Sequence, residues 1–242
     1  MNFRQFELVE RPSFVDYLRS GWQISLTLAL DFTASNGNPS DRNSLHFLGT
    51  TNQYEAAISQ VGQILEAYDQ SKQFPVFGFG GIPRMMGLNS VSHCFPLNGQ
   101  PTNPAIPGIG GILGTYKQNL PSIGLGGPTL FAPILEQFML HTKNNAQFMK
   151  YQILLIITDG IINDMRETIA KIVAVSSLPC SIIIVGVGNA DFSNMEQLDG
   201  DDGKLMDDYR NVASRDIVQF VRFLDCQRMG NLAQEVLMEV PE

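Results

Sequence analysis

The sequence predicts an α/β protein with a doubly wound, mainly parallel sheet flanked by helices. Three runs, Ile24 to Leu30, Gln152 to Ile157 and Ser181 to Val187, are almost continuously apolar, as in strands buried on both faces. Stretches with helical spacing alternate with them. At 242 residues, with 44% hydrophobic and 17% charged residues, the chain is long and apolar enough to bury a sizeable core.

We expect one domain at residues 24–242, preceded by a lead-in segment at residues 1–23. Within the domain, Asp31 ends the first strand, and Asn43 to Leu48 is predicted to form a short second strand. Asn52 and Glu55 form a capping pair, which predicts that a helix with one apolar face follows, from Tyr54 to Tyr68.

Phe74 to Phe79 predicts a further strand, and the Gly-, Pro- and Asn-rich segment Gly80 to Pro107 a long loop. Ile109 to Leu120 has helical spacing that glycines weaken. The next helix follows Gly124 to Thr129, and since Pro133 is tolerated only in a first turn, Thr129 lies at or just before its start.

The carboxyl-terminal part continues the alternation of strands and helices. The expected elements are a helix capped by Asp164 and Glu167, a polar stretch from Gly188 to Arg210, an edge or near-edge strand from Asp216 to Phe223, and a last helix from Asn231 to Val240.

Composition excludes several partners. A net charge of −8 repels nucleic acid and anionic membranes, so neither is expected to bind this chain directly. Cys94, Cys180 and Cys226 are odd in number and widely spaced, as reduced thiols of an intracellular protein would be. The three histidines match no metal-ligand or catalytic spacing and are expected to be structural or at the surface.

Oxygen-bearing side chains follow two of the predicted strands. Asp31, Thr33 and Ser35 stand at alternate positions after the first strand, and Asp159 follows the strand that ends at Ile157. Ligands of open α/β sheets bind beyond the carboxyl ends of strands where strand order reverses, so we expect these residues to meet there, joined by Thr129. Two carboxylates and three hydroxyls suit Mg²⁺ and leave one coordination position open to water or to an acidic group of a partner.

A Mg²⁺-dependent phosphotransferase with Asp31 as nucleophile is the enzymatic alternative. The phosphatase-like Asp-x-Asp pattern would need a second aspartate where Thr33 stands. Walker, dinucleotide-binding and G-x-S-x-G motifs are absent from the sequence. We therefore expect a binding domain and not an enzyme, with a purely structural metal as a third hypothesis.

Long motifs resemble a known family. The Asp-x-Thr-x-Ser pattern, Thr129 and the Thr-Asp-Gly triplet resemble the metal-ion-dependent adhesion site of von Willebrand factor A domains. The chain is most similar to the A domain of copines, through LDFTASNGNP, YDQSKQFPVFGFGG, VSHCF, ILLIITDGIINDM, IIIVGVGNADFSNMEQLDGDDG and RDIVQFV.

This resemblance implies a domain that recruits partner proteins, which we expect to present an acidic residue, within a calcium-responsive, phospholipid-binding protein. It implies two preceding C2 domains, for which this chain has no room, and membrane binding only through them. It places the full-length protein in the cytoplasm and peripherally at membranes. The family's metal site maps onto Asp31, Thr33, Ser35, Thr129 and Asp159, with Mg²⁺, Mn²⁺ or Ca²⁺ as the ion.

Overall fold

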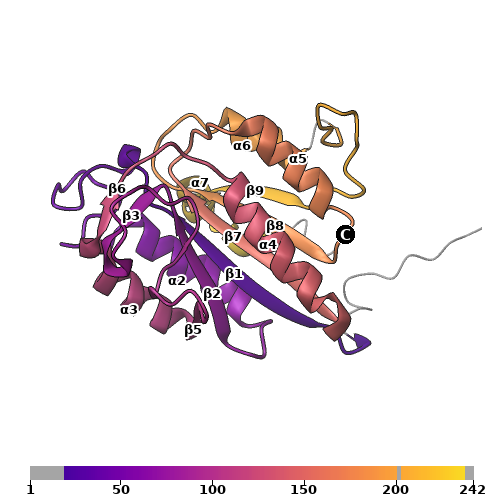
Figure 1. Ribbon diagram of the computed structural model, residues 1–242, viewed down its shortest axis with the longest axis horizontal. Helices are drawn as coiled ribbons and strands as arrows, with labels where there is room; N and C mark the ends of the chain where they lie inside the picture. The colour runs from indigo at the N-terminus through magenta and orange to yellow at the C-terminus, as the bar shows by residue number, and fades with distance from the viewer. Residues whose placement is uncertain (1–18, 201–202, 238–242) are drawn as a thin grey trace, which may run out of the picture.

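A central sheet organises the computed structural model, which describes residues 19–200 and 203–237 (Figure 1). The strands are β1 (Gln23–Asp31), β2 (Gln73–Phe79), β3 (Gly81–Pro83), β4 (Phe95–Pro96), β5 (Ala105–Pro107), β6 (Ile123–Leu125), β7 (Lys150–Thr158), β8 (Cys180–Gly186) and β9 (Val218–Arg222). The α-helices are α2 (Gln53–Glu66), α3 (Gly108–Asn119), α4 (Ala132–Asn145), α5 (Met165–Val175), α6 (Ser193–Asp199), α7 (Phe223–Met229) and α8 (Leu232–Val236).

The strand order is β4-β2-β1-β7-β8-β9, with β5 also paired to β2. Strand β1 pairs in parallel with both β2 and β7, and the parallel pairing continues through β8 to β9. Only β4 and β5 run antiparallel to their neighbour β2. The chain leaves β1 to one side and returns as β7 on the other, so strand order reverses between β1 and β7, as a doubly wound sheet requires.

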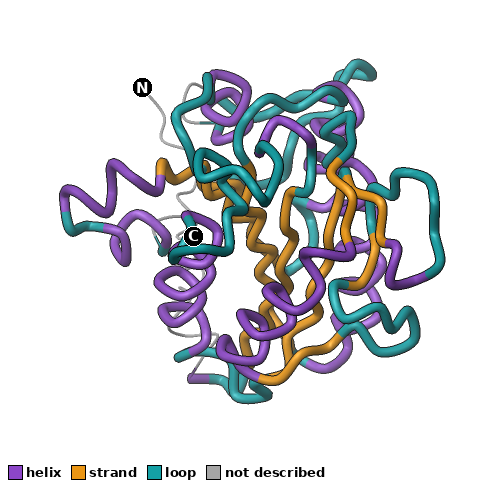
Figure 2. The backbone as a smooth tube through the Cα atoms, turned by 90° about the vertical axis from the view of Figure 1, so that its left-hand side faces the viewer, coloured by secondary structure: helices purple, strands orange, loops and turns teal. Residues whose placement is uncertain are grey.

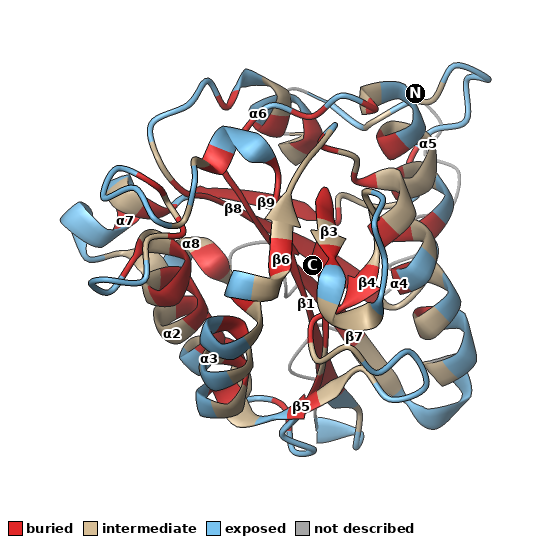
Figure 3. Cartoon of the chain, turned by 60° about the vertical axis from the view of Figure 1, so that its left-hand side comes forward, coloured by how far each residue is buried: buried red, intermediate tan, exposed pale blue. Residues whose placement is uncertain are grey.

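Two apolar cores cover the two faces of this sheet. One contains side chains of α2, α3, α7 and α8, and the other contains side chains of α4, α5 and α6. Figure 2 shows the strands between helices, and in Figure 3 the α2–α3 pair and the α4–α5 pair lie on opposite sides of the buried strands. Residues of β1 from Ile24 to Asp31 are all buried, which is why this strand is almost continuously apolar in sequence.

The predicted strand Asn43 to Leu48 is wrong, because this segment forms turns. The Ser44 hydroxyl shares its one hydrogen between the carbonyls of Asn36 and Gly37, at 3.0 and 2.8 Å, and accepts a hydrogen bond from the His46 amide at 3.0 Å. The two hydrogen bonds to Asn36 and Gly37 fold the segment back onto the loop after β1. His46 is thereby buried, with 0% exposure.

Other predicted boundaries also change. The predicted loop Gly80 to Pro107 contains β3, β4 and β5, and the polar stretch Gly188 to Arg210 contains α6. The edge strand starts at Val218 and gives way to α7 at Phe223. Strands of two or three residues and helices of seven give too short a pattern to read from sequence, since they exist only where neighbouring elements pair with or cover them.

The last predicted helix, Asn231 to Val240, is shorter in the structure, where α8 ends at Val236. Its residues from 238 onward lie outside the described residues, as does the predicted lead-in segment up to residue 18. Among the described residues, no helix is both long and apolar enough to cross a membrane.

Candidate metal centre

Asp31 is the last residue of β1, and its side chain is fully buried. Its Oδ1 accepts hydrogen bonds from the amide of Thr33 at 2.8 Å and from the Thr33 hydroxyl at 2.7 Å. Its Oδ2 accepts a hydrogen bond from the hydroxyl of Thr158, on the neighbouring strand β7, at 2.7 Å. Both carboxylate oxygens are therefore held in fixed positions at the reversal point of the sheet.

Thr33, Ser35 and Asp159 gather around this carboxylate. The Thr33 hydroxyl lies 3.0 Å from the Ser35 hydroxyl, and Ser35 hydrogen-bonds the Asp159 side chain. Ser35 lies in the short 3-10 helix η1 (Ala34–Asn36) and is exposed, whereas Thr33 and Asp159 are buried, with 3% and 7% exposure. Four of the five predicted ligands thus form one continuous cluster that reaches the surface at Ser35.

The cluster carries negative charge in a buried place. Burial, followed by repulsion from Asp159, raises the pKa of Asp31 to about 7, and hydrogen bonds from Thr158 and Thr33 oppose this shift. Burial also raises the pKa of Asp159. Among the described residues, neither carboxylate forms an ion pair with a lysine or arginine. Two adjacent buried carboxylates of this kind call for a cation or a proton between them.

The segment that carries Thr129, the fifth predicted ligand, is joined to the loops around this cluster by hydrogen bonds. Gly126, three residues before it, accepts a hydrogen bond from the Ala34 amide at 2.7 Å and donates one to the Phe32 carbonyl at 3.2 Å. The Thr129 amide donates to Asn163 Oδ1 at 2.8 Å, and its carbonyl accepts from the Asn163 amide at 2.9 Å. The Thr129 segment is therefore tied both to the loop after β1 and to the loop after β7.

Asp164 holds this arrangement in a way that differs from the prediction. It occupies the residue before α5, as expected, but its side chain does not cap the amides of that helix. Its two carboxylate oxygens instead accept the amides of Phe131 and Ala132, at 3.0 and 2.8 Å, at the start of α4. The first amides of a helix have no acceptor within the helix and are strong donors. The start of α4, just after Thr129, therefore binds the Asp164 carboxylate.

A buried network behind Asp31 has no sequence signal. His46 Nε2 lies 2.8 Å from the Asp31 carbonyl, and its Nδ1 lies 2.7 Å from the Tyr116 hydroxyl. Since a carbonyl only accepts, Nε2 donates to it and Nδ1 accepts from Tyr116. Burial lowers the pKa of His46 to about 3, so the ring is neutral. Asn52, whose Oδ1 caps α2 through the amide of Glu55 at 2.9 Å, donates to the Tyr116 hydroxyl at 3.3 Å.

This network agrees with the prediction of a structural role for His46. It fixes the end of β1 to the start of α2 and to α3. Thr158 was the other group not predicted for the site. Thr158 directly precedes Asp159 and ends a buried strand, and this position in the sequence could have indicated that it belongs to the site. The sequence holds no comparable signal for His46, because its contact with Asp31 depends on the fold.

The donor set fits a hard divalent cation. Carboxylate and hydroxyl oxygens are ligands of Mg²⁺, Mn²⁺ and Ca²⁺, and Mg²⁺ in particular keeps several waters and takes few protein groups. Within the described residues, no group of three or more His, Cys, Asp or Glu side chains gathers as a metal site. Asp31 and Asp159 would therefore depend on the hydroxyls of Thr33, Ser35 and Thr129 for further ligands.

Known proteins resemble this chain in sequence and in fold. The copine family model matches residues 44–242. Among solved structures, the VWA domain of SpRpn10 has a TM-score of 0.52 at 10% identity, over 83% of this chain and 87% of that one. The manganese-loaded TRAP protein of Plasmodium vivax has a TM-score of 0.51 at 12% identity, over 87% of this chain and 73% of that one.

A third similar structure is proximal thread matrix protein 1 from the mussel byssus, with a TM-score of 0.50 at 13% identity over 91% of this chain. The chain spans about half of that protein, 47% of its length. Identities this low bear on the fold alone. They confirm the predicted class, a von Willebrand factor A-like α/β fold with a mainly parallel sheet.

Proposed function

The chain belongs to the copine family, and on this basis we propose that its domain binds partner proteins through a divalent cation held by Asp31, Thr33, Ser35, Thr129 and Asp159. The cation is Mg²⁺, with Mn²⁺ and Ca²⁺ as the other ions that this oxygen set suits. A carboxylate of the partner completes the coordination shell.

One observation supports this proposal above the others. Two buried carboxylates, Asp31 and Asp159, lie at the reversal point of the sheet, where burial and, after it, repulsion from Asp159 raise the pKa of Asp31 to about 7. A cation between them removes the cost of two adjacent buried charges. Exposed Ser35 marks the side of the cluster that is open to solvent, and therefore to a partner.

A partner's carboxylate fits this site for an electrostatic reason. Two protein carboxylates balance a divalent charge, but the neutral hydroxyls of Thr33, Ser35 and Thr129 add no further negative charge. The metal therefore remains electrophilic toward one more anionic oxygen. An aspartate or glutamate of a partner supplies that oxygen, and it replaces a water molecule in the shell.

Phosphoryl transfer with Asp31 as nucleophile is less well supported. A nucleophile must be reached by its substrate, and Asp31 is 0% exposed with both oxygens already engaged by Thr33 and Thr158. A Mg²⁺-dependent turnover of phosphoesters that is lost in Asp31→Asn would support this alternative.

The test is isothermal titration of the metal-free protein with Mg²⁺, Mn²⁺ and Ca²⁺. We expect one saturable site in the wild type and its loss in Asp31→Asn and Thr129→Val, which change the side chain with little change in volume. Thr115→Val is the matched control, because Thr115 lies in the middle of α3 and its hydroxyl donates only to Gly111, at 2.9 Å. Equal metal binding by all four proteins would refute the assigned site.

The capture of partner proteins is then measured in the presence of the metal and in the presence of EDTA, and the two results are compared. The family resemblance supports a cytoplasmic setting, in a full-length protein whose C2 domains bind phospholipid in response to calcium. Under this proposal the domain described here contributes the protein-binding part. If the protein still captures its partner in EDTA, and if Asp31→Asn captures it as well, metal-dependent binding is refuted. A purely structural metal would then be the better hypothesis.

A further inference from the structure

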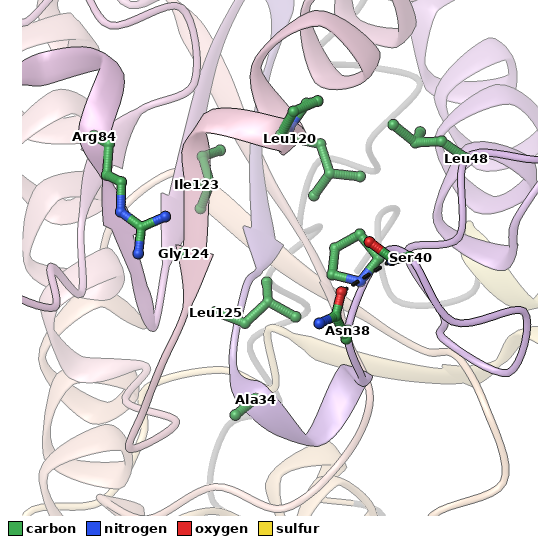
Figure 4. A pocket seen from close by; sticks show the side chains of 11 residues that line it. Ala34, Asn38, Ser40, Leu48, Arg84, Leu120, Ile123, Gly124 and Leu125 are labelled. Atoms are coloured by element: carbon green, nitrogen blue, oxygen red, sulfur yellow. Dashed lines mark hydrogen bonds between the residues drawn. The ribbon is translucent and has the colours of Figure 1, made fainter.

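A groove of about 550 Å³ opens beside the candidate metal centre. Its lining includes Ala34, which lies between Thr33 and Ser35, and Gly124 and Leu125 of β6, with Arg84 at the other end (Figure 4). Leu48, Leu120 and Ile123 also line it and make part of its wall apolar.

The chain that leaves β6 leads from the groove to the metal centre. Arg84 lies over Gly124, where an added Cβ would be 3.2 Å from a guanidinium nitrogen. Two residues further on, Gly126 forms a β-bridge with Thr33, one of the predicted ligands. At about 3.4 Å per residue, this part of the strand covers about 7 Å. Arg84 and the metal centre are therefore separated by roughly two residues of extended chain.

Among the described residues that line the groove, Arg84 is the one that carries a charge. Its side chain is exposed, and it forms no hydrogen bond or ion pair with any described residue. The chain as a whole carries a net charge of −8, so an unpaired guanidinium beside an acidic site is a local exception. A free guanidinium is a donor for a carboxylate.

We propose that this groove binds an extended acidic segment of the partner protein, with one carboxylate on the metal and a second on Arg84. This inference rests on the proposed function, because the first carboxylate needs the metal. Alternate side chains of an extended peptide face the same side, and two positions span about 7 Å, so the two acidic residues stand two positions apart. An aliphatic side chain next to them packs on Leu48, Leu120 and Leu125.

The test uses synthetic peptides with blocked ends. The reference peptide is Gly-Leu-Asp-Gly-Glu-Leu-Gly, which contains two acidic residues two positions apart. In its partner peptide, glutamine replaces the glutamate, which removes one charge at equal size. Two more peptides separate the acidic residues by three and by four positions. The protein is isotope-labelled and saturated with Mg²⁺, in the absence of Mn²⁺. Chemical-shift titration, which measures weak affinities, then follows the binding of each peptide.

We expect the two-acid peptide to bind about two- to fivefold more tightly than the glutamine peptide, the range of an exposed charge pair. This advantage should disappear in Arg84→Gln while the affinity for Mg²⁺, measured by calorimetry, stays the same. Lys143→Gln is the control for net charge, because Lys143 lies in the last turn of α4, away from the site at its start, and should keep the full advantage.

Separate outcomes distinguish the two proposals. If both peptides bind only with Mg²⁺ and the two-acid advantage survives in Arg84→Gln, the role of Arg84 is refuted and the proposed function stands. The same holds if a spacing of three or four positions binds best. If no peptide binds with Mg²⁺ present, or if binding is unchanged in EDTA, the inference fails together with the proposed metal-dependent function.

Discussion

Replacing Asp31 by asparagine is expected to stabilise the metal-free protein, although it removes a predicted metal ligand. In the absence of a cation, the Asp31 carboxylate is a fully buried charge next to Asp159. Asparagine keeps the size and an acceptor oxygen for Thr33 but carries no charge. The folded protein disfavours the charged form of Asp31, so the stabilisation by Asp31→Asn must grow as the pH rises.

The size of the effect follows from the pKa of Asp31, which moves from a usual 3.8 to about 7 on folding. The folded state favours the protonated carboxyl, so its contribution to stability is complete below pH 3.8 and is lost as the pH rises through about 7. Between pH 5 and pH 7 the loss amounts to about 3 kcal/mol, at about 1.4 kcal/mol per pH unit. The stabilisation by Asp31→Asn should thus be about 3 kcal/mol larger at pH 8 than at pH 5, or about 6–12 °C in Tm.

Urea unfolding of both proteins in EDTA at the two pH values measures this difference. Comparing one substitution at two pH values cancels the difference between amide and carboxyl packing. Asp225→Asn is the control, since Asp225 is exposed on α7 and paired only at 3.8 Å with Arg228. A stability change for Asp31→Asn that is the same at pH 5 and pH 8 would refute the account of Asp31 as a buried, uncompensated carboxyl group.

Three further substitutions test the parts that surround the site. Thr158→Val removes the hydroxyl that holds Asp31 Oδ2, so calorimetry at pH 8 should give a metal affinity about 10-fold lower, at the low end for groups that orient metal ligands; an unchanged affinity contradicts this. Asn52→Ala removes the cap of α2 and should cost about 1 kcal/mol in urea unfolding; a neutral result would mean that water replaces it. Asp164→Ala leaves two amides of α4 without acceptors and should cost about 2 kcal/mol or more, together with weaker metal binding through Thr129; normal stability would remove its assigned role.

Hydrophobic pattern and topology rules were enough for the central part of the fold. The runs at β1, β7 and β8 are apolar at almost every position because each strand is buried on both faces, and this pattern survives in the sequence alone. The rule that ligands bind where strand order reverses then placed Asp31 and Asp159 side by side, and the structure has them there. The role of these residues as metal ligands stays a prediction.

Elements that depend on distant partners were not predictable in the same way. Asn43 to Leu48 has apolar residues that suit a strand, yet the Ser44 hydroxyl and the burial of His46 against Asp31 turn the segment back on itself. Asp164 has the position of a cap for its own helix, yet its carboxylate is taken by α4. In both cases a hydrogen bond to a distant residue outweighs the local preference.

The sequence by itself determined the class of fold, the parallel central strands and the set of oxygen-bearing residues at their ends. These features follow from burial and strand order, and both are visible in the sequence as apolar runs that end in polar residues. Only the tertiary structure decided that Thr158 and His46 hold Asp31 in place, and that Arg84, which pairs with no described residue, lies in a groove next to the metal centre. Such contacts join residues far apart in the chain, so their geometry exists only after the sheet and its loops have come together.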